Sequence, residues 1–182
     1  YNYLDSANEA YFNNSIIFTT GTVNDETRIQ VTYPYQGKIW MHNTTIISMG
    51  EDDASSFRVG YSGTYSYGQY DIDDSKLLGL KNIGTGSGYY LQNGDLSVTN
   101  SLLMHYRVPE STSSAVFYDD MCIQSAGFDN VRITGNTLID CGVGYFVPSN
   151  FYATSTYYGG NGTHDLQVNN NTFEDCTVLC MW

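Results

Sequence analysis

The sequence predicts an all-β fold, a solenoid along which one short sequence motif repeats. Two segments near the C-terminus, 131–141 (VRITGNTLIDC) and 166–176 (LQVNNNTFEDC), align without a gap. The motif recurs at intervals of 26 to 36 residues, as from Asp74 to Asn100 and from Asn100 to Asn136. A period of this length indicates stacked supersecondary units rather than one globular core. The six copies begin at Asn14, Thr44, Asp74, Asn100, Asn136 and Asn171.

The expected elements follow in order along the chain. Apolar residues at near-helical spacing in 3–12 predict a short helix over the first coil, so residues 1–13 are assigned as an N-terminal cap or strand. Residues 14–182 are assigned to a single solenoid domain. Alternating or apolar runs predict strands at 16–18, 28–33, 38–41, 96–99 and 131–134. One inward ladder is predicted from the copies, consisting of Ile16, Ile46, Leu102, Leu138 and Phe173.

The fifth copy combines a V-x-I-x strand, a turn with Asn136, a second short strand and a G-x-Φ-x-Φ strand at 144–147. In this it resembles the right-handed parallel β-helix repeat of pectate-lyase-like proteins, and the similarity extends over residues 10–182. The resemblance implies an open-ended, right-handed parallel β-helix of about six coils. Coils stacked about 4.8 Å apart place equivalent residues in ladders. The six Asx or Thr residues that begin the copies are therefore expected to form a structural turn ladder, since Asn tolerates φ > 0.

The charge of the chain excludes some classes of partner, and other features of the sequence indicate where the protein is located. The net charge is −12 with only seven basic residues, which argues against nucleic acid and anionic membranes as partners. No apolar stretch is long enough for membrane insertion. The chain begins at Tyr1 rather than Met, which indicates a removed secretory signal or a fragment. An extracellular or cell-surface location is expected, and sequons at Asn13, Asn43, Asn161 and Asn170 are compatible with glycosylation.

The acidic residues were considered for catalysis and for calcium. Asp71, Asp73 and Asp74 precede the third copy, and the pair 119–120 follows the fourth. Such carboxylates suit glycoside cleavage or calcium binding. Of the motifs that the resemblance implies for pectin hydrolases, only Asp-Asp is present, for which the pair at 119–120 is the candidate, while Gly-His-Gly and Arg-Ile-Lys are absent. Arg107 and Arg132 are predicted to be surface residues without an acidic partner.

No residue is therefore assigned a catalytic or metal-binding role, and the chain is expected not to be an enzyme. The three histidines have no metal-ligand spacing. No cofactor is expected, with calcium as the alternative that the acidic residues leave open.

The four cysteines, Cys122, Cys141, Cys176 and Cys180, all lie in the last third of the chain. An even number without C-x-x-C pairs favours disulfides in an oxidising compartment over zinc. Cys141 and Cys176 occupy the same repeat position, so their Cα atoms are expected about 4.8 Å apart on adjacent coils. A disulfide and a ladder of buried thiols both fit that arrangement. Cys122 and Cys180 have several partners open to them, including other subunits.

Tyrosine-rich segments indicate contact surfaces. Tyr provides a large contact area at low entropic cost, so the segment 61–70 is expected to mediate binding. The leading hypothesis is a structural protein that polymerises with itself through open solenoid ends and Tyr-rich loops into a filament, sheath or surface layer. The alternatives are a polysaccharide-binding adhesive module and the remnant of a polysaccharide lyase or hydrolase. The expected assembly contacts are Tyr61, Tyr65, Tyr67, Tyr70, Met181 and Trp182.

Overall fold

The computed structural model describes residues 2–4, 9–19, 27–31, 36–48, 57–59, 67–84, 95–105, 123–124, 130–140, 145–146, 165–176 and 180–181. The regular structure in these ranges consists of strands, and they pair in parallel throughout. The strands form a six-stranded sheet, which we call sheet I, and a twelve-stranded sheet, whose two parts we call sheets II and III.

Sheet I contains β2 (Glu9–Asn13), β5 (Gln36–His42), β8 (Tyr67–Asp73), β10 (Asp95–Thr99), β13 (Asn130–Thr134) and β16 (Asp165–Asn169). Sheet II contains β3 (Ile16–Thr19), β6 (Thr45–Ser48), β11 (Leu102–His105), β14 (Thr137–Ile139) and β17 (Thr172–Glu174). Sheet III contains β1 (Asn2–Leu4), β4 (Thr27–Val31), β7 (Phe57–Val59), β12 (Ile123–Gln124), β15 (Tyr145–Phe146) and β18 (Cys180–Met181). The long strand β9 (Lys76–Gly84) belongs to both sheets II and III.

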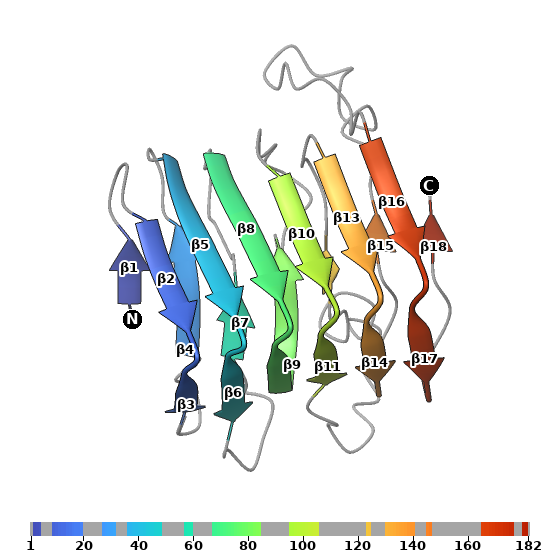
Figure 1. Ribbon diagram of the computed structural model, residues 1–182, viewed down its shortest axis with the longest axis horizontal. Helices are drawn as coiled ribbons and strands as arrows, with labels where there is room; N and C mark the ends of the chain where they lie inside the picture. The colour runs from blue at the N-terminus through green and yellow to red at the C-terminus, as the bar shows by residue number, and fades with distance from the viewer. Residues whose placement is uncertain are drawn as a thin grey trace, which may run out of the picture.

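One strand from each sheet makes one coil, so β2, β3 and β4 form the first coil and β16, β17 and β18 the sixth. Figure 1 shows the six coils stacked side by side from the blue N-terminal end to the red C-terminal end. Sheet I runs downward at the front of that view and sheet III runs upward behind it, which makes the winding right-handed. The predicted right-handed parallel β-helix is confirmed.

In the third coil, β9 passes from sheet II to sheet III as one continuous strand. Gly79 lies at this passage with φ +80°. The register of β11 against β9 skips this residue, since Met104 pairs with Leu78 and His105 with Leu80. A Cβ atom at Gly79 would lie 2.6 Å from the Cβ of Ser48. A glycine is therefore required here both for its backbone conformation and for the close approach of β6.

The hydrophobic core fills the space inside the coils. Along each strand of sheet I, alternate side chains point inward, so that Ile39, Tyr70, Leu96 and Val131 stack as one ladder across β5, β8, β10 and β13. Period-two alternation places one set of side chains in the core and the other on the surface. The remaining core positions, all almost fully buried, are Met41, Ile46, Val59, Ile72, Leu77, Leu80, Ile83, Val98, Leu103, Ile123, Ile133 and Leu138.

The predicted inward ladder is partly wrong in register. Ile17, not Ile16, pairs with Ile46, and the ladder continues through Leu77, Leu103, Leu138 and Phe173. Ile16 and Leu102 each lie one residue before the inward position, so they are on the outer face of sheet II. A slip of one residue moves a side chain to the opposite face of its strand. Phe173 occupies the predicted ladder, but it is 47% exposed on β17.

The helix expected within residues 3–12 is also wrong. This part of the chain contains β1 and β2, and β2 pairs residue by residue with β5. Ala10 and Phe12 face inward opposite Ile39 and Met41. Pairing with β5 therefore overrides a weak helical spacing, and residues 2–4 and 9–13 are strands.

The six residues predicted to form one turn ladder belong to two ladders, which occupy adjacent positions of the turn. Asn14, Asp74 and Asn100 share a left-handed position, with φ of 47° to 50°. Thr44, Asn136 and Asn171 occupy the next residue position, directly after the left-handed one. The complete left-handed ladder is Asn14, Asn43, Asp74, Asn100, Gly135 and Asn170, and the second ladder is Ser15, Thr44, Ser75, Ser101, Asn136 and Asn171.

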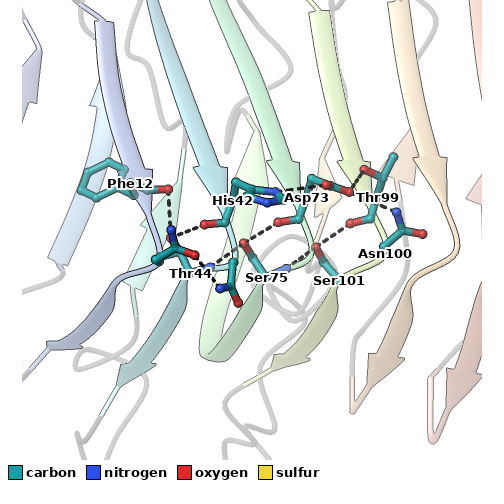
Figure 2. Close-up of polar contacts among 10 residues, drawn as sticks. Phe12, His42, Thr44, Asp73, Ser75, Thr99, Asn100 and Ser101 are labelled. Carbon is teal, nitrogen blue, oxygen red and sulfur yellow. Dashed lines mark hydrogen bonds and ion pairs between the residues drawn. The ribbon is translucent and has the colours of Figure 1, made fainter.

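The second ladder, which we call the polar turn ladder, is a continuous chain of hydrogen bonds between coils. The backbone N–H of Thr44 donates to Ser75 Oγ at 3.2 Å, and that of Ser75 donates to Ser101 Oγ at 3.0 Å (Figure 2). The N–H of Ser101 then donates to Asn136 Oδ1, and the N–H of Asn136 to Asn171 Oδ1, both at 2.9 Å. The ladder therefore provides a partner for each of these turn N–H groups, which burial would otherwise leave without one.

Candidate ligand-binding face

The outer face of sheet I presents three parallel rows of side chains, because the strands are in register and every second residue points outward. We call them rows A, B and C. Each row crosses six strands and is about 24 Å long at the spacing of strands in a sheet. Row A is Glu9, Lys38, Gln69, Asp95, Asn130 and Asp165; row B is Tyr11, Trp40, Asp71, Ser97, Arg132 and Gln167; row C is Asn13, His42, Asp73, Thr99, Thr134 and Asn169.

An aromatic pair forms one end of row B. The ring centroids of Tyr11 on β2 and Trp40 on β5 are 4.3 Å apart, with an angle of 45° between the ring planes. Tyr11 is 59% exposed and Trp40 is partly exposed. Lys38 Nζ lies 5.3 Å from the Trp40 ring centroid and 3.7 Å from Glu9 Oε1. Two adjacent aromatic rings exposed on a flat sheet are a typical contact surface for a ligand.

The tyrosine hydroxyl is held in place by row A. Tyr11 Oη donates a hydrogen bond to Glu9 Oε2, and this bond is the main cause that raises the pKa of Tyr11 above its usual value. Glu9 thus accepts from Tyr11 and pairs with Lys38, which in turn lies over Trp40. These contacts restrict the orientation of the aromatic pair before a ligand arrives.

A shallow groove of about 300 Å³ continues the same face across β8, β10, β13 and β16. Its charged side chains are Asp71, Asp95, Arg132 and Asp165. Asn130 Nδ2 donates to Asp95 Oδ1 at 2.6 Å. Within the part of the chain that the structure describes, neither Asp71 nor Arg132 forms a hydrogen bond or an ion pair with its side chain. Both charges are therefore available to a ligand. The amides Gln69, Asn130 and Gln167 and the hydroxyl of Ser97 complete the polar lining.

Row C contains a hydrogen-bonded cluster around Asp73, shown in Figure 2. Thr99 Oγ1 donates to Asp73 Oδ1 at 2.6 Å, Asn100 Nδ2 donates to the same oxygen at 3.1 Å, and His42 Nδ1 lies 3.2 Å from Asp73 Oδ2. These contacts, with the Thr99 hydrogen bond first, lower the pKa of Asp73 below its usual value. Asp73 therefore stays ionised, and its oxygens are engaged with neighbours rather than directed at the groove.

The acidic residues considered in the sequence have three different roles in the structure. Asp71 lines the groove, Asp73 organises row C, and Asp74 occupies a left-handed turn. Arg132 is exposed as predicted, and it lines the same groove as Asp71 without forming an ion pair among the described residues. The pair at 119–120 and Arg107 lie outside the described residues.

The predicted contact, glycosylation and disulfide residues are described only in part. The prediction that Tyr70 is an assembly contact is wrong, because its side chain is fully buried in the core. Asn13, Asn43 and Asn170 are exposed, and Asn43 Nδ2 donates to Asn14 Oδ1 at 2.7 Å. Cys176 Sγ contacts the carbonyl oxygen of Leu138 at 3.2 Å. Outside the described residues lie Tyr61, Tyr65, Cys122, Cys141, Asn161 and Trp182, as do the side chains of Tyr67, Cys180 and Met181.

The aromatic pair was missed in the sequence, although a signal for it exists. Trp40 lies between Ile39 and Met41, and Tyr11 lies between Ala10 and Phe12. In a strand with one buried face, a residue between two inward apolar residues must point outward. The alternation therefore places both rings on the surface once β2 and β5 are recognised as neighbours.

Among the described ranges, no group of three or more His, Cys, Asp or Glu side chains is arranged to hold a metal ion. The same part of the chain contains no helix with the length and apolarity needed to cross a bilayer.

Fold and site together define an all-β parallel solenoid with an exposed face of aromatic, acidic and amide side chains. Comparison of the chain with protein-family models, with curated proteins and with solved structures found no match. The arguments for function therefore depend on the geometry of this chain.

Proposed function

We propose that the outer face of sheet I binds a carbohydrate chain, and that the protein is a polysaccharide-binding adhesive module located outside the cell or on its surface. The observation that carries this proposal is row B, in which the exposed Tyr11 and Trp40 rings continue directly into the groove. Trp40 pairs with Asp71 across β5 and β8, so the aromatic pair and the first groove carboxylate are on adjacent strands.

The chemistry of the face suits a sugar polymer. Aromatic rings pack against the apolar faces of sugar rings, while carboxylates, amides and hydroxyls bind the hydroxyl groups at the ring edges. Row B supplies the rings, and the groove supplies Asp71, Arg132 and the amides of Asn130 and Gln167. A face that is flat and about 24 Å long accommodates an extended polymer rather than a small compact ligand.

The same proposal places the chain in the pectate-lyase-like superfamily as a member that binds without cleaving. The support is the three-strand coil with its left-handed Asn turn and polar turn ladder. An extracellular location agrees with exposed sequon residues Asn13, Asn43 and Asn170.

The proposal is tested by measuring the binding of oligosaccharides to the wild type and to W40A and Y11A by isothermal titration calorimetry. Loss of a stacked ring is expected to weaken binding by about tenfold. The matched control is F18A, because Phe18 is an exposed aromatic residue on sheet II, at 62% exposure. Release of reducing ends is measured in parallel, and none is expected. Equal binding by W40A, Y11A and F18A, or binding by none of the proteins to any glycan, would refute the proposal.

Self-assembly is a second candidate, and it has its own supporting observation. The outer face of sheet II carries an apolar row in which Phe18 pairs with Ile47, Ile47 with Leu78, Leu78 with Met104 and Met104 with Ile139. Phe18 and Met104 are exposed, at 62% and 39%. The same row on a second copy has the same spacing, so two copies can pack sheet against sheet in register.

Self-assembly is tested by light scattering at high protein concentration in oxidising buffer that contains calcium. The wild type is expected to associate, and the double variant F18S/M104S to remain a monomer. A monomeric wild type under these conditions contradicts lateral assembly through this face.

A further inference from the structure

The charges of the groove specify which sugars fit it. The groove contains the carboxylates of Asp71, Asp95 and Asp165 and one guanidinium, that of Arg132, so three negative charges face one positive charge. We infer that the ligand is a glycan that carries protonated amino groups, such as a polymer of glucosamine, rather than a polymer of uronic acids. This inference rests on the proposed carbohydrate-binding function.

The position of Asp71 supports an amino group on the ligand. Asp71 adjoins Trp40 in row B, and it has no partner among the described residues. A sugar ring stacked on Trp40 therefore has a free carboxylate about one strand spacing, ~4.8 Å, farther along the row. An ammonium group donates up to three hydrogen bonds and forms an ion pair with a carboxylate, whereas a neutral hydroxyl donates one hydrogen bond and forms no ion pair there.

Row A provides further acceptors for a cationic polymer. Asp95 and Asp165 lie on either side of Asn130, one on β10 and one on β16. Each already accepts one side-chain amide hydrogen bond, from Asn130 and Gln167 respectively, and a carboxylate has capacity for more. The carboxylates are thus two strand spacings, about 10 Å, apart along the axis, so amino sugars at different positions of one polymer have separate partners.

The charge of the whole chain acts in the same direction. A net charge of −12 attracts polycations and repels polyanions over distances near the Debye length. Among the described residues that line the groove, Arg132 is the only cation, and one guanidinium is outnumbered by three carboxylates. A uronate polymer therefore meets unfavourable charge both on approach and in the groove, unless a divalent cation bridges the two.

The test compares three families of oligosaccharide of equal length at about pH 5.5, where Asp carboxylates and primary amines are both ionised. They are oligomers of glucosamine, oligomers of N-acetylglucosamine, and oligogalacturonates with and without calcium. Acetylation removes the charge and keeps the sugar ring. Glucosamine oligomers are expected to bind tenfold or more tightly than the acetylated ones, and the difference is expected to shrink as salt is added.

The variant D71N is paired with D74N as its control. Asp74 is exposed, lies in a left-handed turn that Asn also tolerates, and does not line the groove, so both variants remove one negative charge from β8 and its turn. D71N is expected to weaken binding of glucosamine oligomers roughly three- to tenfold and to leave binding of acetylated oligomers unchanged. D74N is expected to leave both unchanged. Thermal melting confirms that both variants are folded.

The outcomes separate this inference from the proposed function. Equal binding of charged and acetylated oligomers, equal effects of D71N and D74N, or preferential binding of oligogalacturonate with calcium would overturn the amino-sugar inference. In each of these cases a loss of binding in W40A still supports a carbohydrate-binding face. If no oligosaccharide binds, the proposed function fails first.

Discussion

Replacement of Asn136 by Ala is the most direct test of the polar turn ladder. Asn136 is 1% exposed, its Oδ1 accepts from the backbone N–H of Ser101 at 2.9 Å, and its Nδ2 donates to the carbonyl oxygen of Val98 at 2.8 Å. The alanine variant leaves the buried N–H of Ser101 without its acceptor, which costs about 1–3 kcal/mol, and loses the bond to Val98, worth about 0.5–1.5 kcal/mol. We expect N136A to lower the free energy of unfolding by about 2–4 kcal/mol.

The serine variant is a matched control, because Ser already occupies this ladder position in three other coils. Ser75 Oγ and Ser101 Oγ each accept the N–H of the preceding coil and donate to the carbonyl two residues earlier in their own chain. N136S therefore keeps the acceptor for Ser101 and loses mainly the bond to Val98, at a cost of about 1 kcal/mol.

The measurement is urea unfolding followed by circular dichroism, with midpoints compared at equal slopes. If N136A and N136S have the same midpoint, the Ser101 N–H is satisfied in another way, and the ladder does not stabilise the fold as we argue.

Three further predictions concern stability. In wild type, the carboxylate of Asp73 has a pKa below its usual 3.8, so it contributes stability above about pH 4 that is lost as the pH falls through the lower native pKa. D73N should therefore be destabilised at pH 7, by about 0.5–1 kcal/mol after allowance for solvent screening, and its difference from wild type should shrink as the pH falls below about 4, as measured by urea unfolding at several pH values. G79A should lower stability by about 1–3 kcal/mol in thermal unfolding, because its φ is +80° and the added Cβ meets Ser48; an unchanged melting temperature would contradict the tight passage of β9. L103A should cost about 2–5 kcal/mol and M104A less than 1 kcal/mol in chemical denaturation, because Leu103 is buried and Met104 points outward; similar losses would mean that the register of β11 is wrong.

Much of the fold follows from patterns that act locally. The alternation in 96–99 and 131–134 predicts strands because a one-sided core selects every second residue, and β10 and β13 are found there. The ungapped match of 131–141 with 166–176 predicts stacked coils, and β13 and β16 pair over their full length. Winding direction and sheet number do not follow from alternation alone, and the resemblance of the repeat supplied them.

The register at the turns could not be read from the sequence because two neighbouring residues suit each turn. Asn43 and Thr44, or Asn170 and Asn171, are both polar residues common in turns. Only the pairing between coils decides which residue takes the left-handed conformation, and Asn43 and Asn170 take it. In the fifth coil Gly135 does so, which moves Asn136 into the buried position.

The groove depends on this register, so it could not be predicted from the sequence. Asp71 and Arg132 belong to strands far apart in the sequence, and they share row B only because β8, β10 and β13 are in register. An error of one residue would place one of them in the core.

The polar turn ladder makes the coils interchangeable building blocks. The second to fifth coils each present an amide hydrogen toward the coil that follows, and the third to sixth coils present a side-chain oxygen, from Ser or Asn, toward the coil that precedes. A coil duplicated between β10 and β13 would meet a matching donor on one side and a matching acceptor on the other. The molecule can thus be lengthened or shortened by whole coils, and a longer version would carry a proportionally longer outer face on sheet I.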